Sequence, residues 1–266
     1  MFARRLVERF LLEVVLQRDG VIVFAALVAV TIFAWVYLLQ MNGQVVGIDV
    51  SDEMVMPVGR TWSAVDFTTQ FFMWVVMMVA MMLPSASPFI LMVAAVNRKR
   101  REFYGPLIPT GFFVLGYFLT WAAFSLVATV AQWALHSTAL LSPDIASASP
   151  LLGGLFLLVA GFFQFTELKR VCLKHCRSPL GFLMRRWREG RKGALCMGIE
   201  HGLYCVGCCW ALMMLMFVAG VMNLLWFAVI SLLVFGEKAL LHGEVVRRIG
   251  GTALLVAGGA LLALVL

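Results

Sequence analysis

The chain has 266 residues, of which 62% are hydrophobic and only 13% are charged, and its formal net charge is +7. Soluble domains of this length carry more charge, so the composition excludes a soluble fold and indicates a membrane protein. The basic residues are concentrated in short segments between long apolar runs. That placement is typical of a topology signal and does not predict a nucleic-acid partner.

Residues 1–20 combine acidic and basic side chains with Phe10, Leu11, Val14 and Val15. This mixture predicts a short amphipathic helix on the membrane surface. No small-residue cleavage site follows the first apolar run, so a cleaved signal peptide is not predicted. We therefore expect an amphipathic cytoplasmic segment at 1–20 and a transmembrane helical domain at 21–266.

Long apolar runs, each near the ~20 residues that cross a bilayer, predict an all-α, polytopic transmembrane bundle with about seven spans. We expect these spans at 21–40, 69–96, 107–134, 150–170, 195–218, 221–241 and 249–266. The last run is short and rich in glycine. Gly220 and Asn223 are the candidates for a tight turn between the fifth and sixth spans.

Alternating loop charges predict the orientation. Segments 97–101 and 169–192 are strongly basic and Arg247 and Arg248 precede the last span, whereas 41–66 and 135–149 are acidic or nearly uncharged. The positive-inside rule then places the N-terminus in the cytoplasm and the C-terminus in the periplasm of a bacterial inner membrane. The lipid bilayer is thus the first predicted partner.

A methionine run occupies the second predicted span. Met73, Met77 and Met81 are four residues apart and share one helical face, and Pro84 and Pro88 predict a kink just beyond them. Thioethers are good ligands for Cu(I) and poor ones for zinc or magnesium. The run could instead be a flexible apolar packing surface.

All six cysteines fall between residues 172 and 209, in two groups that each contain a histidine. The first group is Cys172, His175 and Cys176, and the second is Cys196, His201, Cys205, Cys208 and Cys209. Thiols beside imidazoles are typical of a soft-metal site. Both groups are expected toward the cytoplasm, where thiols stay reduced, so disulfides are the weaker interpretation.

The spacing of these residues predicts that they converge. Met197, His201, Cys205 and Cys208 form one stripe of the fifth span, with Cys209 at its edge. If the fourth and fifth spans pack together, Cys172 and Cys176 meet that stripe. The predicted metal ligands are Cys205, Cys208 and Cys172 first, then Cys176, His201 and Cys209, with Met73, Met77 and Met81 as a relay or second site. The alternative is that these cysteines are small apolar packing residues.

Several polar groups interrupt the apolar spans, where they suggest function or a partner. They are Gln164, Glu167, Glu200, Asn223, Glu237 and Lys238. Glu167 is a candidate hard ligand or proton acceptor, and Glu237 with Lys238 reads as a pair at the membrane boundary. No phosphate-binding glycine loop or serine nucleophile motif is present in the sequence, so an enzyme is not predicted.

The chain resembles a family of predicted metal-binding integral membrane proteins. The resemblance runs from about residue 70 to 240 and includes Met73-Trp74, Met77-Met78, Met81-Met82 and Pro84. Its most specific part is Gly207-Cys208-Cys209-Trp210, and Glu237-Lys238 also belongs to it. The resemblance implies copper handling, in some members for the maturation of copper oxidases such as tyrosinase.

Taken together, the sequence predicts a membrane protein that binds Cu(I) and delivers it to a copper-requiring enzyme or membrane complex. Zinc and iron are the weaker alternatives. The cysteine spacing is not the paired C-x-x-C of a zinc ribbon, so it indicates a metal without specifying which one. Two other functions remain open: thiol–disulfide exchange with a partner, and an accessory subunit of a larger membrane complex.

Overall fold

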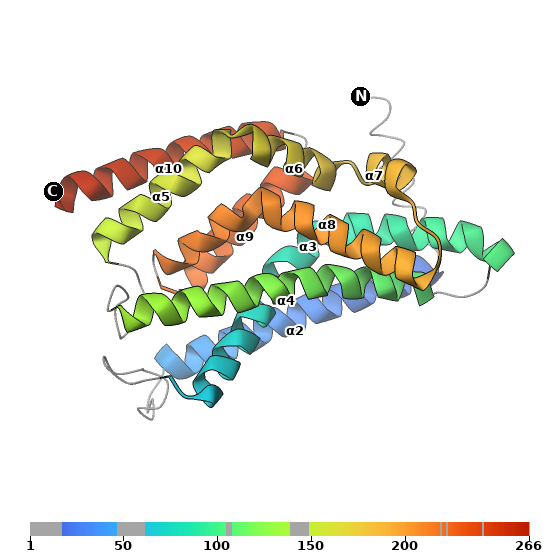
Figure 1. Cartoon of the computed structure of the whole chain (residues 1–266), viewed down its shortest axis with the longest axis horizontal. Helices are drawn as coiled ribbons and strands as arrows, with labels where there is room; N and C mark the ends of the chain where they lie inside the picture. The colour runs from blue at the N-terminus through green and yellow to red at the C-terminus, as the bar shows by residue number, and fades with distance from the viewer. Residues whose placement is uncertain are drawn as a thin grey trace.

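The computed structural model describes residues 18–46, 62–104, 108–138, 149–218, 220–221, 223–240 and 242–265. Residues 1–17 of the amphipathic segment predicted at 1–20 lie outside these ranges, as do most of the predicted loops 41–66 and 135–149. The described residues form nine α-helices and one short 3-10 helix, and their arrangement is shown in Figure 1. The predicted all-α class is therefore confirmed.

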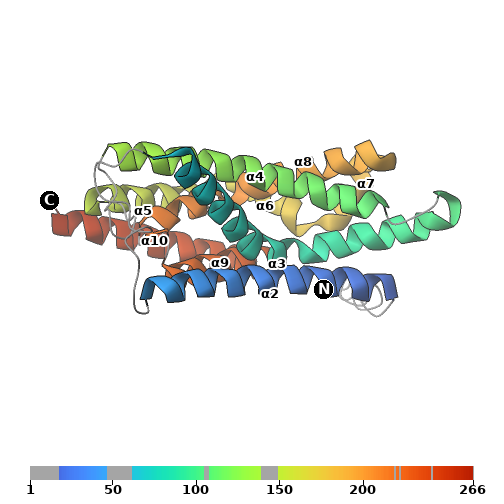
Figure 2. The same ribbon diagram turned by 90° about the horizontal axis from the view of Figure 1, so that it is seen from below.

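The helices run back and forth along the long axis of the molecule (Figures 1 and 2). Their bounds are α2 Arg18–Val46, α3 Ala64–Tyr104, α4 Ile108–Ser137, α5 Pro150–Phe165, α6 Glu167–Arg177, α7 Pro179–Arg186, α8 Gly190–Met214, η1 Leu215–Phe217, α9 Leu224–Ala239 and α10 Gly243–Val265. Gly220, with φ of +94°, and Asn223, which caps α9, form the predicted turn after α8.

Five described helices are long and apolar enough to cross a membrane, or six if the bent pair α5–α6 counts as one span. The five are α2, α3, α4, α8 with η1, and α10. Seven spans are not shown, for two reasons. The run predicted at 150–170 bends by 66° between α5 and α6, and the run at 221–241 yields α9, which has only 16 residues and is about 24 Å long.

Local chemistry explains the bends. Thr166 ends α5 in extended conformation, and its side chain accepts a hydrogen bond from the Lys169 backbone N–H at the start of α6. In α3, Pro84 and Pro88 interrupt the backbone ladder, and Figure 2 shows the helix changing direction along its length.

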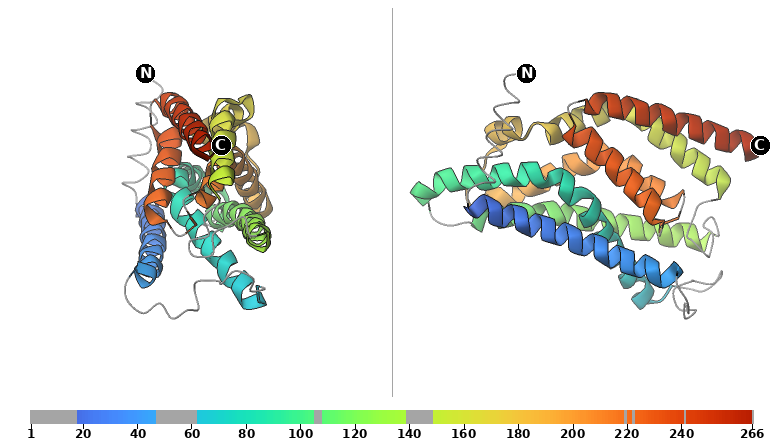
Figure 3. Two further views of the ribbon diagram at one scale, coloured as in Figure 1. Left: turned by 90° about the vertical axis from the view of Figure 1, so that its left-hand side faces the viewer. Right: turned by 180° about the vertical axis from the view of Figure 1, so that it is seen from behind.

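Glycines bring two pairs of helices into close contact. A Cβ on Gly116 of α4 would collide with the Leu195 backbone oxygen, and one on Gly198 of α8 would collide with that of Phe113. Gly154 and Gly161 similarly admit Leu262 and Leu255 of α10 against α5. Small residues of this kind let membrane helices approach closely. Figure 3 shows α5 beside α10 at one edge of the bundle, while α2 lies at another.

Candidate metal centre

The centre of the bundle is formed around α8. Cys205, Cys208 and Cys209 are buried there, and the thiols of Cys208 and Cys209 donate hydrogen bonds to the Cys205 carbonyl, at 3.1 and 2.9 Å. These backbone contacts hold both side chains along the helix. The helix therefore presents three thiols to the helices around it.

Helix α6 brings the first cysteine group to α8, as the sequence predicted. Cys176 Sγ lies 4.0 Å from Cys208 Sγ. Cys172 Sγ lies over Gly207, where an added Cβ would be only 3.0 Å from the sulfur. The bend between α5 and α6 makes this contact possible, because it turns α6 away from the line of α5.

Helix α3 contributes a sulfur from Met82. Its Sδ lies 3.9 Å from Cys209 Sγ. Met73, Met77 and Met81 are also buried, but Met77 lines a small cavity beside Leu38 and Phe227. The methionine that contacts the cysteines is thus one that the four-residue spacing did not select. The sequence carried a signal for it, since Met82, Ser85 and Phe89 follow one helical face.

Lys238 of α9 points toward these sulfur atoms. Its Nζ lies 3.0 Å from Cys205 Sγ, 3.4 Å from Ser85 Oγ and 3.7 Å from Met82 Sδ. Tyr117 of α4 adds its hydroxyl at 3.3 Å from Cys205 Sγ. Sequence reasoning assigned neither Lys238 nor Tyr117 to the site. We call the group Cys176, Cys205, Cys208, Cys209 and Met82 the sulfur cluster.

Glu237, the neighbour of Lys238, has entirely different partners. Its carboxylate lies 2.7 Å from Lys169 Nζ and accepts a hydrogen bond of 2.7 Å from Gln164 Nε2. All three side chains are buried. The two residues therefore do not form the boundary pair that the sequence suggested, because adjacent helical positions point about 100° apart.

The remaining predicted residues occupy other surroundings. His201 is buried among aromatic rings, and its ring centroid is 3.8 Å from that of Phe89. Met197 Sδ accepts a hydrogen bond from the Arg188 backbone N–H, and Cys196 is exposed. Glu167 is exposed and pairs with Arg170 at 2.6 Å, while Glu200 pairs with Arg186 at 3.0 Å.

The spacing of the sulfurs suits two-coordinate binding. Two sulfurs on one metal ion at about 2.3 Å each can be up to about 4.6 Å apart. The Cys176–Cys208 and Cys209–Met82 separations of 4.0 and 3.9 Å fall inside that limit. Within the described part of the chain, no three side chains drawn from His, Cys, Asp and Glu form a group that could hold a metal ion. The predicted ligand set therefore stays a prediction.

These features define a polytopic helical membrane protein with a buried, sulfur-rich centre. The model of the PpoB2 family, described as copper chaperones, matches residues 71–261, and the chain belongs to this family. No curated protein and no solved structure matches the chain. The function that follows is delivery of copper rather than catalysis.

Proposed function

We propose that the cargo is Cu(I) and that the sulfur cluster carries it. Soft thiolate and thioether ligands select Cu(I), and the cluster draws them from α3, α6 and α8. The two sulfur pairs allow an incoming ligand to displace an outgoing one, which a carrier requires. Cys172, whose sulfur lies over Gly207, completes the set beside the cluster.

The observation that carries this proposal is the position of Lys238. An ammonium group withdrawn from water needs compensating charge or polar partners, and for the half-buried Lys238 these are Cys205, Ser85 and Met82. The two sulfur atoms that surround this monovalent cation, Cys205 Sγ and Met82 Sδ, are soft ligands that would also suit Cu(I). His201 and the methionines Met73, Met77 and Met81 stay candidate secondary ligands.

We further propose seven passes, with α5–α6 as one bent span and α9 as a short span inside the bundle. Figure 1 supports this, since α2, α3, α4, α5–α6, α8, α9 and α10 run in alternating directions along the long axis. The basic segments would face the cytoplasm and the C-terminus the periplasm of a bacterial inner membrane. Residues 1–20 would lie on the cytoplasmic surface, and 21–266 would form the membrane domain. The client would be a copper-requiring enzyme.

Metal analysis of the detergent-purified protein tests the cargo and the ligands together. Wild-type protein loaded anaerobically is expected to retain copper in preference to zinc and iron. The Cys205→Ser, Cys208→Ser variant should lose it, and Met82→Leu should weaken retention against a Cu(I) chelator. The matched controls are Cys196→Ser, which changes an exposed thiol, and Met184→Leu, which changes an exposed methionine of α7.

Two results would contradict the assignment. Full copper content in the double cysteine variant would show that the sulfur cluster is not the site. Reversible disulfides among Cys205, Cys208 and Cys209, with no bound metal, would instead favour thiol–disulfide exchange.

A further inference from the structure

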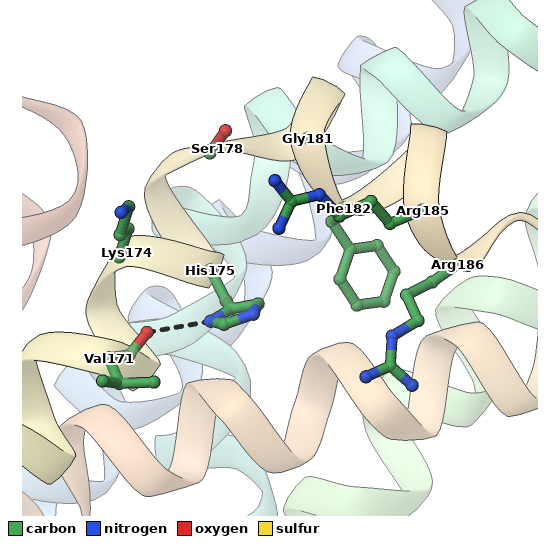
Figure 4. Close-up of a pocket in the computed structure, with 8 residues that line it drawn as sticks. All are labelled: Val171, Lys174, His175, Ser178, Gly181, Phe182, Arg185 and Arg186. Carbon is green, nitrogen blue, oxygen red and sulfur yellow. Dashed lines mark hydrogen bonds between the residues drawn. The ribbon is translucent and has the colours of Figure 1, made fainter.

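His175 has the arrangement of a metal ligand that the sulfur cluster does not include. Its Nδ1 lies 2.9 Å from the Val171 backbone oxygen (Figure 4). A carbonyl oxygen can only accept, so Nδ1 is the donor and the neutral ring keeps a lone pair on Nε2. Metal-binding histidines commonly donate their second ring N–H to such an oxygen, which fixes the tautomer and the orientation of the ring.

The ring is also held firmly against α8. It stacks on Tyr204 with centroids 4.3 Å apart and planes 1° from parallel. Tyr204 and Cys208 are one helical turn apart, and Cys208 is the partner of Cys176. His175 and Cys176 thus contact successive turns of the same helix.

Burial increases from this point into the bundle. His175 and Cys176 are half-buried, whereas Cys205, Cys208 and Cys209 are buried. The side chains that could bind copper thus extend from His175 and Cys176, at the surface of the bundle, to the buried cysteines of α8. A copper ion entering or leaving by this path would meet His175 before the buried thiols.

A pocket of about 370 Å³ opens at His175 between α6 and α7. The residues that line it include Lys174 and His175 from α6 and Phe182, Arg185 and Arg186 from α7. Figure 4 shows His175 facing Phe182, with Lys174 on the far side of His175 from α7. No acidic residue is among those lining it. Arg186 pairs with Glu200, but no acidic side chain among the described residues pairs with Lys174 or Arg185. The pocket thus offers uncompensated positive charge and an apolar ring to an anionic guest.

We propose that this pocket is the port of the copper path, and that it binds an anionic thiol complex of Cu(I). Lys174 and Arg185 would hold the carboxylates of the carrier, and His175 Nε2 would be the first protein ligand of the metal. Copper then passes to Cys176 and Cys208 by ligand exchange. Each protein thiol that takes copper gives its proton to the departing carrier sulfur, so no oxidant or reductant is needed. This inference rests on the proposed function.

Loading kinetics of the full chain test the port. The copper donors are the Cu(I) complex of glutathione, which is anionic, and the cationic acetonitrile complex of Cu(I). His175→Phe keeps a ring to stack on Tyr204 but lacks Nε2, and we expect it to slow loading from both donors by about tenfold, with unchanged final copper content. Lys174→Gln, Arg185→Gln should slow loading by about tenfold from the glutathione complex only.

The matched control is Arg191→Gln, Lys192→Gln, which removes the same charge from exposed positions on α8 outside the pocket. It should load at the wild-type rate from both donors. Equal slowing in this control, or wild-type rates in His175→Phe, would overturn the port. A wild-type protein that never acquires Cu(I) would overturn the proposed function itself, so the two failures are distinguishable.

An anionic lipid headgroup has the same chemistry as the carrier carboxylates and could occupy the pocket. Loading in nanodiscs of phosphatidylglycerol or of phosphatidylcholine separates the two sources. If the pocket binds the carrier, copper should load from the glutathione complex at similar rates in both lipids. Strong inhibition by phosphatidylglycerol that disappears in Lys174→Gln, Arg185→Gln would assign the pocket to lipid and reject the carrier.

Discussion

Glu237 and Lys238 show how finely this protein places charge. Glu237 joins Lys169 and Gln164, so that a single carboxylate connects α9 with α6 and α5. Lys238 joins the sulfur cluster instead. Charges in an apolar bundle persist only with such partners. The Lys169–Glu237 ion pair and the contacts of Lys238 together hold α6 and α9 in position around the thiols.

The Lys169–Glu237 pair gives a stability prediction. Glu237→Gln leaves the Lys169 ammonium buried without a counter-charge, and we expect a loss of roughly 3–5 kcal/mol in the free energy of unfolding. Adding Lys169→Met removes the stranded charge and should recover much of that loss. Thermal unfolding in detergent measures both variants. Additive losses in the double variant would show that the pair is not coupled.

The residue types predicted the chemistry of the site better than they predicted which residues form it. The two cysteine groups were expected to meet, and Cys176 and Cys208 do. The contact of Met82 with Cys209 was not predicted, because a four-residue repeat describes one face of α3 without saying which face meets α8. Lys238 was missed because a lysine near a span end is ordinarily read as reaching toward water.

At the scale of elements, α8 is the scaffold of the protein. It carries the thiols on one side and packs against α4 through backbone contacts at Gly116 and Gly198. It also faces α6, whose approach depends on the break at Thr166. Any change that moves α8 away from these helices would spread the sulfurs.

Two glycines of α4 test this close packing. In Gly116→Ala the new Cβ would collide with the Leu195 backbone oxygen, and we expect destabilisation of about 1–3 kcal/mol together with weaker copper retention. Gly111→Ala is the matched control, because its Cβ meets nothing within 4 Å. That change should be neutral or slightly stabilising, by up to about 1 kcal/mol. Thermal unfolding of the two variants compares them directly, and equal melting temperatures would disprove the contact.

At the scale of the whole molecule, the C-terminal end of α3, the helix α7 and the start of α8, which carry basic residues, lie toward one end of the bundle (Figures 1 and 2). The α7–α8 connection lies there, as does Cys196 near the start of α8. Basic segments that are separate in the sequence therefore lie toward the same end of the folded bundle. This agreement is what the positive-inside rule requires of a single orientation.

The exposed thiol of Cys196 makes that orientation measurable. A membrane-impermeant maleimide should label Cys196 in inverted membrane vesicles and leave it unlabelled in intact spheroplasts, because its end of the bundle is predicted to be cytoplasmic. The control is a Cys196→Ser, Ser137→Cys variant, since Ser137 ends α4 at the opposite end. The control should label in spheroplasts. The reverse pattern would invert the proposed topology.

The sequence by itself determined the helical membrane class and most of the candidate spans, and it predicted copper as the cargo. These follow from local properties: the length of the apolar runs and the softness of sulfur as a ligand. Only the tertiary structure decided that 150–170 bends, that α9 is short, and that Met82, Tyr117 and Lys238 join the thiols. Those facts depend on which face of each helix meets its neighbour, and packing between distant segments sets that face.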